Sequence, residues 1–557
     1  MNAKNEIQTQ TTIERHLQSL LRKDYLKKLE RGAGLTRPMD FYAALEDIPN
    51  NDLDAGRLMK SIFHDTLTYI PTSASKGDWY FWNGAIHEKH DLGLIDDFLT
   101  IGLADYLRDY ARQLTEDAKK LITEEDRKAV EGGINALRKY ASMIRSAQPM
   151  RNLRSRICLA FTRTRDHFDN DAQWVVLANG EVQDLSKLDG DLLPADPSRP
   201  VSRALGVSYH PNAPFPTKWV ESLNQWVPDK GVQKYLQVAA GAALLGKGDA
   251  KNIVALVGVS NTGKSTYLNI LKEVFGGYAG ALPATAIVQK YGGASNFEQA
   301  KARGKRFLYL SEPQKQRTDD SFLKNLSGGG ETIMTAEKGK DAVEWQAQCV
   351  LHIAANHVPE FDTQDNAIVE RMNLVGFDHV FPRDASGSAD TFAKDVVAEE
   401  GSAIFLWIVE GAAIYKELGY IPVPEAIRAK SKGNVVEASA PLRWLNEVIG
   451  DGHYHRVPGA PMASFEKPVD LYPQFVTWCL SSGEKKVVSQ KTWLAEIERF
   501  NEMPADKKGK RSQGFARVYG VVSESTFRTL PQGQGAAFAP SGKGMKWSVA
   551  AKSAEEV

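Results

Sequence analysis

Short apolar runs and longer amphipathic spacings alternate along the chain, and their order predicts where its elements lie. Between residues 40 and 150 the apolar positions recur with mostly helical spacing. Aromatic and aliphatic runs that end in Asn-Gly, at 79–84 and 174–180, predict two tight hairpins. Residues 192–217 carry six prolines and are typical of a connector, and helices are predicted over 219–245.

From residue 252 onward the pattern changes to that of an α/β sheet. Three short apolar runs, 253–257, 307–310 and 350–354, predict strands buried on both faces, as in a parallel sheet. A Gly-rich turn and an amphipathic helix over 266–275 follow the first of these strands. A further amphipathic helix is predicted over 402–417. This part of the chain therefore predicts an α/β core.

The C-terminal part predicts a second, smaller unit. Residues 421–432 have the composition of a linker, and helices are predicted over 441–449, 471–481 and 490–500. A β-like run, 515–522, follows them. Helices followed by a hairpin with a basic loop favour a winged-helix-like domain.

The same C-terminal unit has a local excess of positive charge. Between residues 484 and 520, nine Lys or Arg face five Asp or Glu. Lys508, Lys510 and Arg511 cluster in the loop before the predicted strand and are candidate contacts to DNA phosphates. A solvated basic loop on a packing domain remains the alternative.

Composition excludes several classes of protein. Lys plus Arg and Asp plus Glu are both 69, so there is no global basic field, and any nucleic-acid site must be local. Three widely separated cysteines exclude a disulfide scaffold or a cysteine zinc site. No apolar run approaches the ~20 residues that a membrane span requires, and the first 30 residues lack the apolar core of a signal peptide. We therefore expect a cytoplasmic protein without membrane contact, divided into several domains across its 557 residues.

One motif carries specific chemistry. Residues 258–265 match the phosphate-binding pattern G-x-x-x-x-G-K-[ST] at every fixed position, between an apolar strand and an amphipathic helix. The glycines permit a loop whose N–H groups cradle phosphates, while Lys264 faces the β- and γ-phosphates and Ser265 ligates Mg²⁺. The predicted nucleotide-binding residues are Gly258, Val259, Ser260, Asn261, Thr262, Gly263, Lys264, Ser265 and Thr266.

Three further residues complete a predicted hydrolytic site for ATP. Glu312 follows the second predicted strand, where an acidic residue can polarise the attacking water and help to hold Mg²⁺. Asn356 follows the third strand, where its amide can orient that water. Arg371 comes fifteen residues later and can reach the γ-phosphate bound to a neighbouring subunit. The alternatives are a solvated Glu, a structural Asn and an exposed Arg.

The order of these segments resembles a known family. The runs 258–266, 304–313, 323–329, 355–359 and 370–372 are similar to the ordered motifs of the superfamily 3 helicases. The branch they most resemble comprises the phage, satellite and plasmid primase-helicases related to poxvirus primase-helicase. The similarity extends over about residues 75 to 525. Since only about 50 residues precede the helical region, too few for a primase catalytic domain, we expect no priming activity.

The resemblance implies an AAA+-like ATPase that assembles as a hexameric ring, with each ATP site between subunits. It makes Lys264, Ser265 and Glu312 Walker residues, Asn356 a sensor and Arg371 an arginine finger acting in trans. The segment after the glycines at 328–330 would be a pore hairpin that grips one DNA strand. Its lysines, Lys338 and Lys340, flank a glycine at the predicted tip, although two solvated lysines in a turn are the alternative.

These inferences predict a P-loop AAA+-like ATPase core between a mainly helical N-terminal domain and a winged-helix-like C-terminal domain. The expected divisions are a helical extension (1–50), a helical collar (51–215), the ATPase (216–420), the basic domain (421–530) and a flexible tail (531–557).

The predicted function is an ATP- and Mg²⁺-dependent DNA helicase, with 3′→5′ movement implied by the resemblance, in replication of a mobile element. Expected partners are single-stranded DNA, duplex origin DNA, further copies of the chain and a separate primase or other replication proteins. The alternatives are an ATP-gated origin-binding initiator and a P-loop scaffold ATPase.

Overall fold

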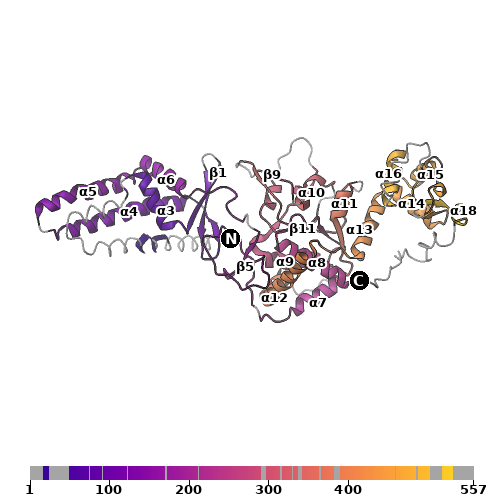
Figure 1. Ribbon diagram of the computed structural model, residues 1–557, viewed down its shortest axis with the longest axis horizontal. Helices are drawn as coiled ribbons and strands as arrows, with labels where there is room; N and C mark the ends of the chain where they lie inside the picture. Colours follow the sequence, from indigo (N-terminus) through magenta and orange to yellow (C-terminus); the bar gives the residue numbers. More distant parts are fainter. Residues whose placement is uncertain are drawn as a thin grey trace.

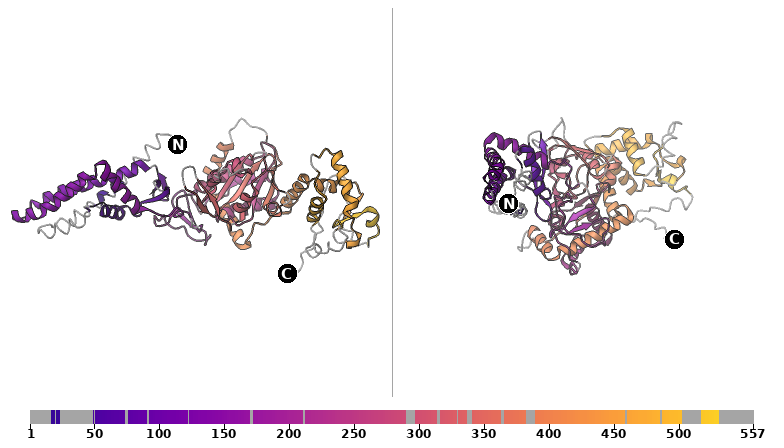
Figure 2. Two further views of the ribbon diagram at one scale, coloured as in Figure 1. Left: turned by 90° about the horizontal axis from the view of Figure 1, so that it is seen from above. Right: turned by 60° about the vertical axis from the view of Figure 1, so that its left-hand side comes forward.

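The computed structural model describes residues 17–19, 21–23, 49 and 51–530, with the exception of 74–75, 91, 122, 170–171, 211, 290–296, 314–315, 329, 337–340, 363–364, 382–388, 458–459, 485–486 and 502–516. The described chain is elongated (Figure 1). N-terminal helices form one end, an α/β sheet the middle and a second helical unit the other end. The three parts also lie in line when the molecule is seen from above (Figure 2).

In the described N-terminal residues, helices and a small sheet pack around one apolar core. The helices include α3 (Asp52–Phe63), α4 (Leu92–Ala118), α5 (Glu124–Met143) and α6 (Ala147–Phe161), and the antiparallel strands are β1 (Leu67–Ser73), β2 (Lys76–Trp82) and β3 (His87–His90). The predicted hairpin at 79–84 is the turn between β2 and β3, where the Asn83 side chain accepts hydrogen bonds from the N–H groups of Ala85 and Ile86. Asn is favoured at turns because its side chain can accept such backbone hydrogen bonds.

The second predicted hairpin is also present and leads into two helices. Strands β4 (Trp174–Val176) and β5 (Val182–Asp184) pair antiparallel. The proline-rich connector follows them and ends where α7 (Thr217–Trp226) begins. Helix α8 (Lys230–Leu244) comes next, with Asp229 accepting the N–H of Val232 at its N-terminus.

The central sheet has five parallel strands in the order β12-β6-β11-β8-β7. They are β6 (Ile253–Val257), β7 (Ala279–Ala281), β8 (Phe307–Ser311), β11 (Val350–Ala355) and β12 (Met372–Gly376). Three of them are the strands predicted from apolar runs. The order places β6, which precedes the Gly-rich loop, between β11 and β12. Because the strands are parallel, the carboxyl ends of β6, β8 and β11 lie at the same edge of the sheet.

Both faces of the sheet are covered, which explains the apolar character of its strands. One face packs against α8, α9 (Lys264–Phe275) and α12 (Ala389–Leu418). The other face packs against α10 (Asp320–Gly328) and α11 (Asn366–Arg371). Short 3-10 helices lie at Gly276–Tyr278, Ala284–Ile287 and Gln299–Ala302.

Helices α8 and α12 touch through two glycines. A side chain on Gly241 would place its Cβ 2.1 Å from the Ala412 nitrogen, and one on Gly411 would come as close to the Gln237 carbonyl oxygen. The backbones therefore approach closely. Helix α12 also packs on α9 and is longer than the predicted 402–417.

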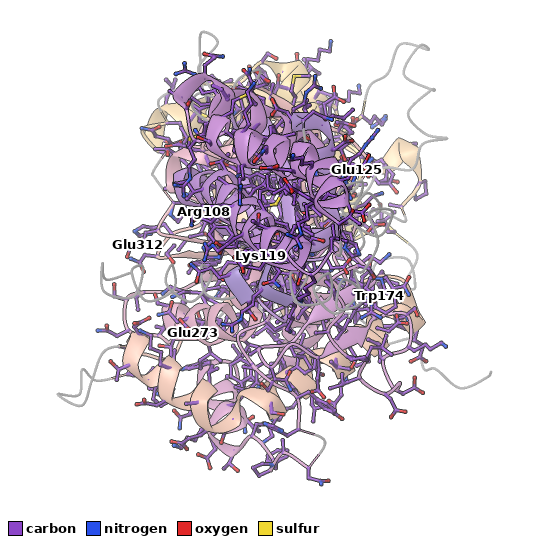
Figure 3. The ribbon with its side chains drawn as sticks, turned by 90° about the vertical axis from the view of Figure 1, so that its left-hand side faces the viewer. Arg108, Lys119, Glu125, Trp174, Glu273 and Glu312 are labelled. Carbon is purple, nitrogen blue, oxygen red and sulfur yellow. The ribbon has the colours of Figure 1, made fainter. Side chains whose placement is uncertain are left out.

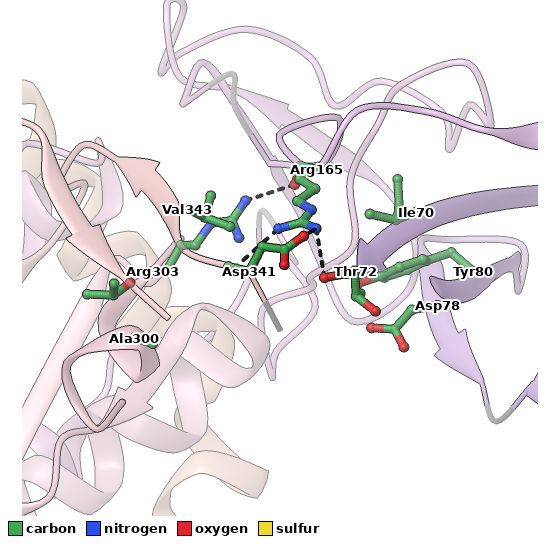
Figure 4. A pocket seen from close by; sticks show the side chains of 10 residues that line it. Ile70, Thr72, Asp78, Tyr80, Arg165, Ala300, Arg303, Asp341 and Val343 are labelled. Atoms are coloured by element: carbon green, nitrogen blue, oxygen red, sulfur yellow. Dashed lines mark hydrogen bonds and ion pairs between the residues drawn. The ribbon is translucent and has the colours of Figure 1, made fainter. Parts of the chain in front are cut away.

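A two-stranded hairpin lies where the pore hairpin was expected. It pairs β9 (Ile333–Thr335) with β10 (Val343–Trp345). The Arg165 guanidinium ties it to the N-terminal sheet (Figure 4). It donates to Asp341 Oδ2 at 2.6 Å and to the carbonyl oxygens of Pro71 and Thr72 at 2.9 and 2.7 Å. The hairpin is thus held against a sheet that is far away in sequence.

The C-terminal part differs from the sequence prediction in one linker and in the length of one strand. The predicted linker 421–432 is wrong, because α13 (Glu425–Ala438) begins within it and packs on β12, where Ser431 Oγ accepts the N–H of Leu374. The predicted strand 515–522 is reduced among the described residues to β14 (Val521–Ser523), which pairs with β13 (Tyr454–Arg456). The other elements are α14 (Ala440–Gly450), a 3-10 turn (Met462–Ser464), α15 (Pro468–Ser481), α16 (Gln490–Phe500) and α18 (Glu524–Phe527).

Candidate functional site

The Gly-rich loop connects β6 to α9 and takes its shape from two residues with left-handed backbone. Asn261 and Gly263 have φ angles of 63° and 91°. Only Gly fits the second position, because a Cβ there would lie 2.3 Å from the indole of Trp226 in addition to the strained φ. On its other side the loop is closed by the Phe381 N–H, which donates to the Asn261 carbonyl oxygen at 2.8 Å.

Lys264 begins α9 and turns back over the loop. Its Nζ donates to the carbonyl oxygens of Gly258 and Val259, both at 2.6 Å, and to Thr262 Oγ1 at 3.0 Å. Burial lowers the pKa of Lys264, whereas the Glu312 carboxylate acts to raise it. Among the described residues the ammonium group therefore donates hydrogen bonds only to oxygens of its own loop. A bound phosphate would give it a charged acceptor in place of these neutral ones.

Glu312 and Asn356 come directly after β8 and β11, at the same edge of the sheet as the loop. Glu312 has a φ of 54°, and its N–H donates to the Ala354 carbonyl oxygen at 2.8 Å. A non-glycine residue in this conformation is strained, and such residues concentrate at functional sites. Both side chains are exposed. The Glu312 side chain projects from the outer edge of the molecule in Figure 3.

These groups meet in one cavity of about 790 Å³. It is lined at one end by residues 260–266 of the loop and α9, together with Ser311, Glu312 and Asn356. A second hollow of about 440 Å³ adjoins it beyond Glu312 and Asn356. A cavity of this size fits a small organic ligand, with cationic and hydrogen-bonding groups concentrated at the loop end.

The oxygen donors at the loop end also fit a hard divalent cation. The Ser265 hydroxyl and the Glu312 carboxylate are both exposed and line the same cavity. Mg²⁺ is typically held by one or two protein oxygens plus substrate phosphates and water. Within the described ranges no group of three His, Cys, Asp or Glu is arranged to hold a metal by itself. A Mg²⁺ ion at this place would be held by one or both of these side chains together with phosphate oxygens and water.

Arg371 does not reach this cavity in the same chain. It ends α11 and precedes β12, whose first residue pairs with Ile253 at the start of β6. The arginine thus lies at the edge of the sheet opposite to the loop. Its Nη1 donates to the Ala367 carbonyl oxygen at 2.6 Å, and its buried Nε has no partner among the described residues.

The predicted DNA contacts cannot be placed. Lys338, Lys340, Lys508, Lys510 and Arg511 all lie outside the described residues.

Sequence reasoning missed the far wall of the cavity. This wall consists of Ser222, Gln225 and Trp226 from α7, and of Phe381, Ala389, Thr391, Phe392 and Asp395 around the start of α12. No spacing rule connects these two segments with the loop. A weak sequence signal for this wall was Trp226, an aromatic residue at the end of the predicted helical region before the strand at 253–257.

Two family models match the chain. Residues 56–228 match the model described as D5 N terminal like, which covers most of the N-terminal part and α7. Residues 256–371 match a family of unknown function, DUF5906, which covers the loop, Glu312, Asn356 and Arg371.

Viral proteins named "Putative helicase" also match. One from Invertebrate iridescent virus 6 is 24% identical over 320 residues, 53% of this chain and 33% of that protein. Others come from Acanthamoeba polyphaga mimivirus (22% identical; 27% of this chain, 16% of that protein) and Sputnik virophage (27%; 26% and 19%). The chain thus resembles D5-like viral helicases over part of its length. Its matches span no more than a third of the length of these relatives.

Solved structures of the NrS-1 C-terminal region are similar to this D5-like chain at low identity. One is 16% identical with a TM-score of 0.31, covering 53% of this chain and 68% of the other. Another is 15% identical with a TM-score of 0.34, covering 56% and 67%.

The resemblance to viral helicases predicted from the motifs is confirmed. Among the described residues of this D5-like chain, no helix combines the length and the apolar composition needed to cross a membrane.

Proposed function

We propose that the chain is an ATP-dependent DNA helicase motor whose hydrolytic site is the cavity between the 258–265 loop and the β8 and β11 strand ends. One observation carries the proposal: Lys264, Glu312 and Asn356, from three separate segments, line a single cavity at the edge of a parallel sheet where ligands of open α/β sheets bind. A cation, a carboxylate and an amide are the side chains that phosphoanhydride hydrolysis needs.

Each residue has a distinct role in the proposed reaction. The loop N–H groups and the start of α9 hold the phosphates, and Lys264 exchanges its loop carbonyl contacts for the β- and γ-phosphate oxygens. Glu312 polarises the attacking water, which the Asn356 amide orients. Mg²⁺ held by Ser265 and, through water, by Glu312 would neutralise charge on the phosphates.

Arg371 acts on the site of a neighbouring subunit in this proposal. Its position at the opposite edge of the sheet supports a role in trans, since it cannot serve the cavity of its own chain. Assembly as a hexameric ring then places each ATP between two subunits. The ATPase spans about 216–420, and the 333–345 hairpin grips single-stranded DNA through Lys338 and Lys340.

The remaining parts have supporting roles in the proposal. The basic C-terminal part, 421–530, binds duplex DNA through Lys508, Lys510 and Arg511, and the N-terminal part forms the collar of the ring. Movement is 3′→5′, and a separate primase or other replication proteins of a mobile element are the partners.

The deciding experiment is ATP hydrolysis by the purified full chain, with and without single-stranded DNA, at low and high salt. We expect DNA to stimulate turnover and salt to weaken the stimulation, because phosphate contacts release counterions. Lys264→Ala should abolish hydrolysis, whereas the control Lys301→Ala, at an exposed lysine that does not line the cavity, should not. Turnover retained by Lys264→Ala would refute the assignment of the loop. Activity indifferent to DNA would favour an initiator or a scaffold ATPase.

The trans role has its own test. Arg371→Ala should bind ATP but hydrolyse it poorly, and so should Glu312→Gln. In a ring, mixing the two variants creates some interfaces with both wild-type residues and should restore part of the activity. Native mass spectrometry on the mixture would verify that the subunits exchange. Exchange without any recovery of activity would contradict a trans arginine.

A further inference from the structure

The cavity has a second end that phosphate chemistry does not require. Away from the loop it is lined by three aromatic residues, Trp226, Phe381 and Phe392, and by the Gln225 amide. Among the lining residues on this side that the structure describes, Asp395 alone carries a charge. A triphosphate would occupy the cationic end only. The aromatic end therefore has the composition of a site for a flat, uncharged group attached to the phosphates.

Two helices form this end, and buried contacts hold them together. The buried Glu400 carboxylate on α12 accepts the N–H groups of Lys218 and Trp219, each at 2.9 Å, and so caps the start of α7. The Trp219 ring packs edge-on against Trp407 of α12, with ring centroids 5.2 Å apart. The walls are thus preorganised rather than assembled by a ligand.

The direction of the two helices follows from the same contacts. Glu400 meets the first turn of α7, while the cavity is lined by the last turn of α7 and by α12 residues that precede Glu400. The helices therefore run antiparallel along this wall. Phe392, near the start of α12, lies across from Gln225 and Trp226 at the end of α7.

Two of these three aromatic side chains, Trp226 and Phe392, differ in how much of their surface is exposed. Trp226 is only 5% exposed, since its indole edge supports Gly263 of the loop. Phe392 is 43% exposed although it lines a cavity, and it is one of the large apolar side chains that the fold leaves uncovered. An aromatic face left open in the wall of a preorganised cavity is a surface on which another ring can stack.

We propose that Phe392 stacks on the base of the bound nucleoside triphosphate, with the Gln225 amide at the edge of that base, an assignment that rests on the nucleotide site proposed above. The loop end anchors the phosphates, and the base lies between α7 and the start of α12. Stacking favours the larger purine ring, and a Gln amide can pair with both N6 and N7 of adenine. The substrate class is therefore a purine, preferentially adenine, nucleoside triphosphate.

The test separates the base from the phosphates by using two probes. Binding of Mg-ATP and of Mg-tripolyphosphate, which lacks the nucleoside, is measured by calorimetry for the full chain and its variants. Phe392→Ala should weaken ATP binding about 5- to 150-fold, the range for loss of one base–aromatic stack, without changing tripolyphosphate affinity. Phe392→Trp should restore ATP binding. Phe215→Ala, which removes a 72% exposed phenylalanine outside the cavity, is the matched control.

Specificity is tested with Gln225→Ala, which should lose most of the preference for ATP over GTP while binding tripolyphosphate like the wild type. The base site is refuted if Phe392→Ala binds ATP within twofold of the wild type, or if it loses ATP and tripolyphosphate equally. A wild-type chain that binds neither probe would instead overturn the nucleotide site itself. The two failures are therefore distinguishable.

Discussion

His352 makes the stability of the central sheet depend on pH in a way that can be calculated. It lies in β11, the middle strand, and is fully buried. Its ring contacts Phe307 and Tyr267, with centroids 4.7 and 6.4 Å away, and its Nε2 has no partner among the described residues. Its Nδ1 is 3.3 Å from the Val350 carbonyl oxygen. Burial lowers the pKa of His352 to about 4, against 6.5 for an exposed imidazole.

The sign follows from proton binding. Well above pH 6.5 the imidazole is neutral in both states, so it adds no pH dependence there. Between pH 6.5 and 4 the unfolded chain binds a proton that the folded chain does not, so the free energy of unfolding falls as pH falls. The loss is about 2 kcal/mol at pH 5 and about 3 kcal/mol below pH 4, since each pKa unit is worth about 1.36 kcal/mol.

The comparison with His352→Phe isolates this contribution, because carboxylates titrate equally in both proteins. Urea unfolding at pH 7.5 and pH 5.0 is followed by hydrogen exchange in peptides from β6, β8 and β11. The wild type should lose about 2 kcal/mol more than the variant between these pH values. His352→Leu provides a second comparison should the larger ring be poorly accommodated. Equal losses in wild type and both variants would refute the burial of a neutral imidazole.

Three other substitutions test contacts around the site. Glu400→Ala should lower the free energy of unfolding by about 2 kcal/mol, because two α7 N–H groups lose their acceptor. It should also weaken ATP binding. Thermal unfolding measures the first effect and calorimetry the second, with Glu400→Gln as the milder control. A double-mutant cycle of Arg165→Ala and Asp341→Ala should give a coupling energy of about 0.5–1 kcal/mol, and zero coupling would contradict the ion pair. Arg165→Ala alone should raise the rate of hydrogen exchange in the β9–β10 hairpin. Gly263→Ala should weaken nucleotide binding at least tenfold because of its φ and the adjacent indole, whereas Gly450→Ala, with open space around it, should not.

Local signals predicted the elements around the candidate site well. The apolar run 253–257, the glycines of the loop and the amphipathic helix after it are adjacent in sequence, and each has a residue preference that follows from its own backbone. The hairpins at 79–84 and 174–180 were predictable for the same reason. The linker prediction at 421–432 failed because the polar composition of α13 hides a helix whose buried positions are few.

The sequence by itself thus determined most of the elements, the position of the Gly-rich loop between a strand and a helix, and the resemblance to viral helicases. Only the tertiary structure decided which distant residues share the cavity. Parallel pairing of β6, β11 and β8 brings Glu312 and Asn356 to the loop, and the Glu400 contact brings Phe392 opposite Trp226. Local periodicity records which face of an element is buried, but not which other element buries it. The strand order and the antiparallel α7–α12 pair therefore had to be seen in three dimensions.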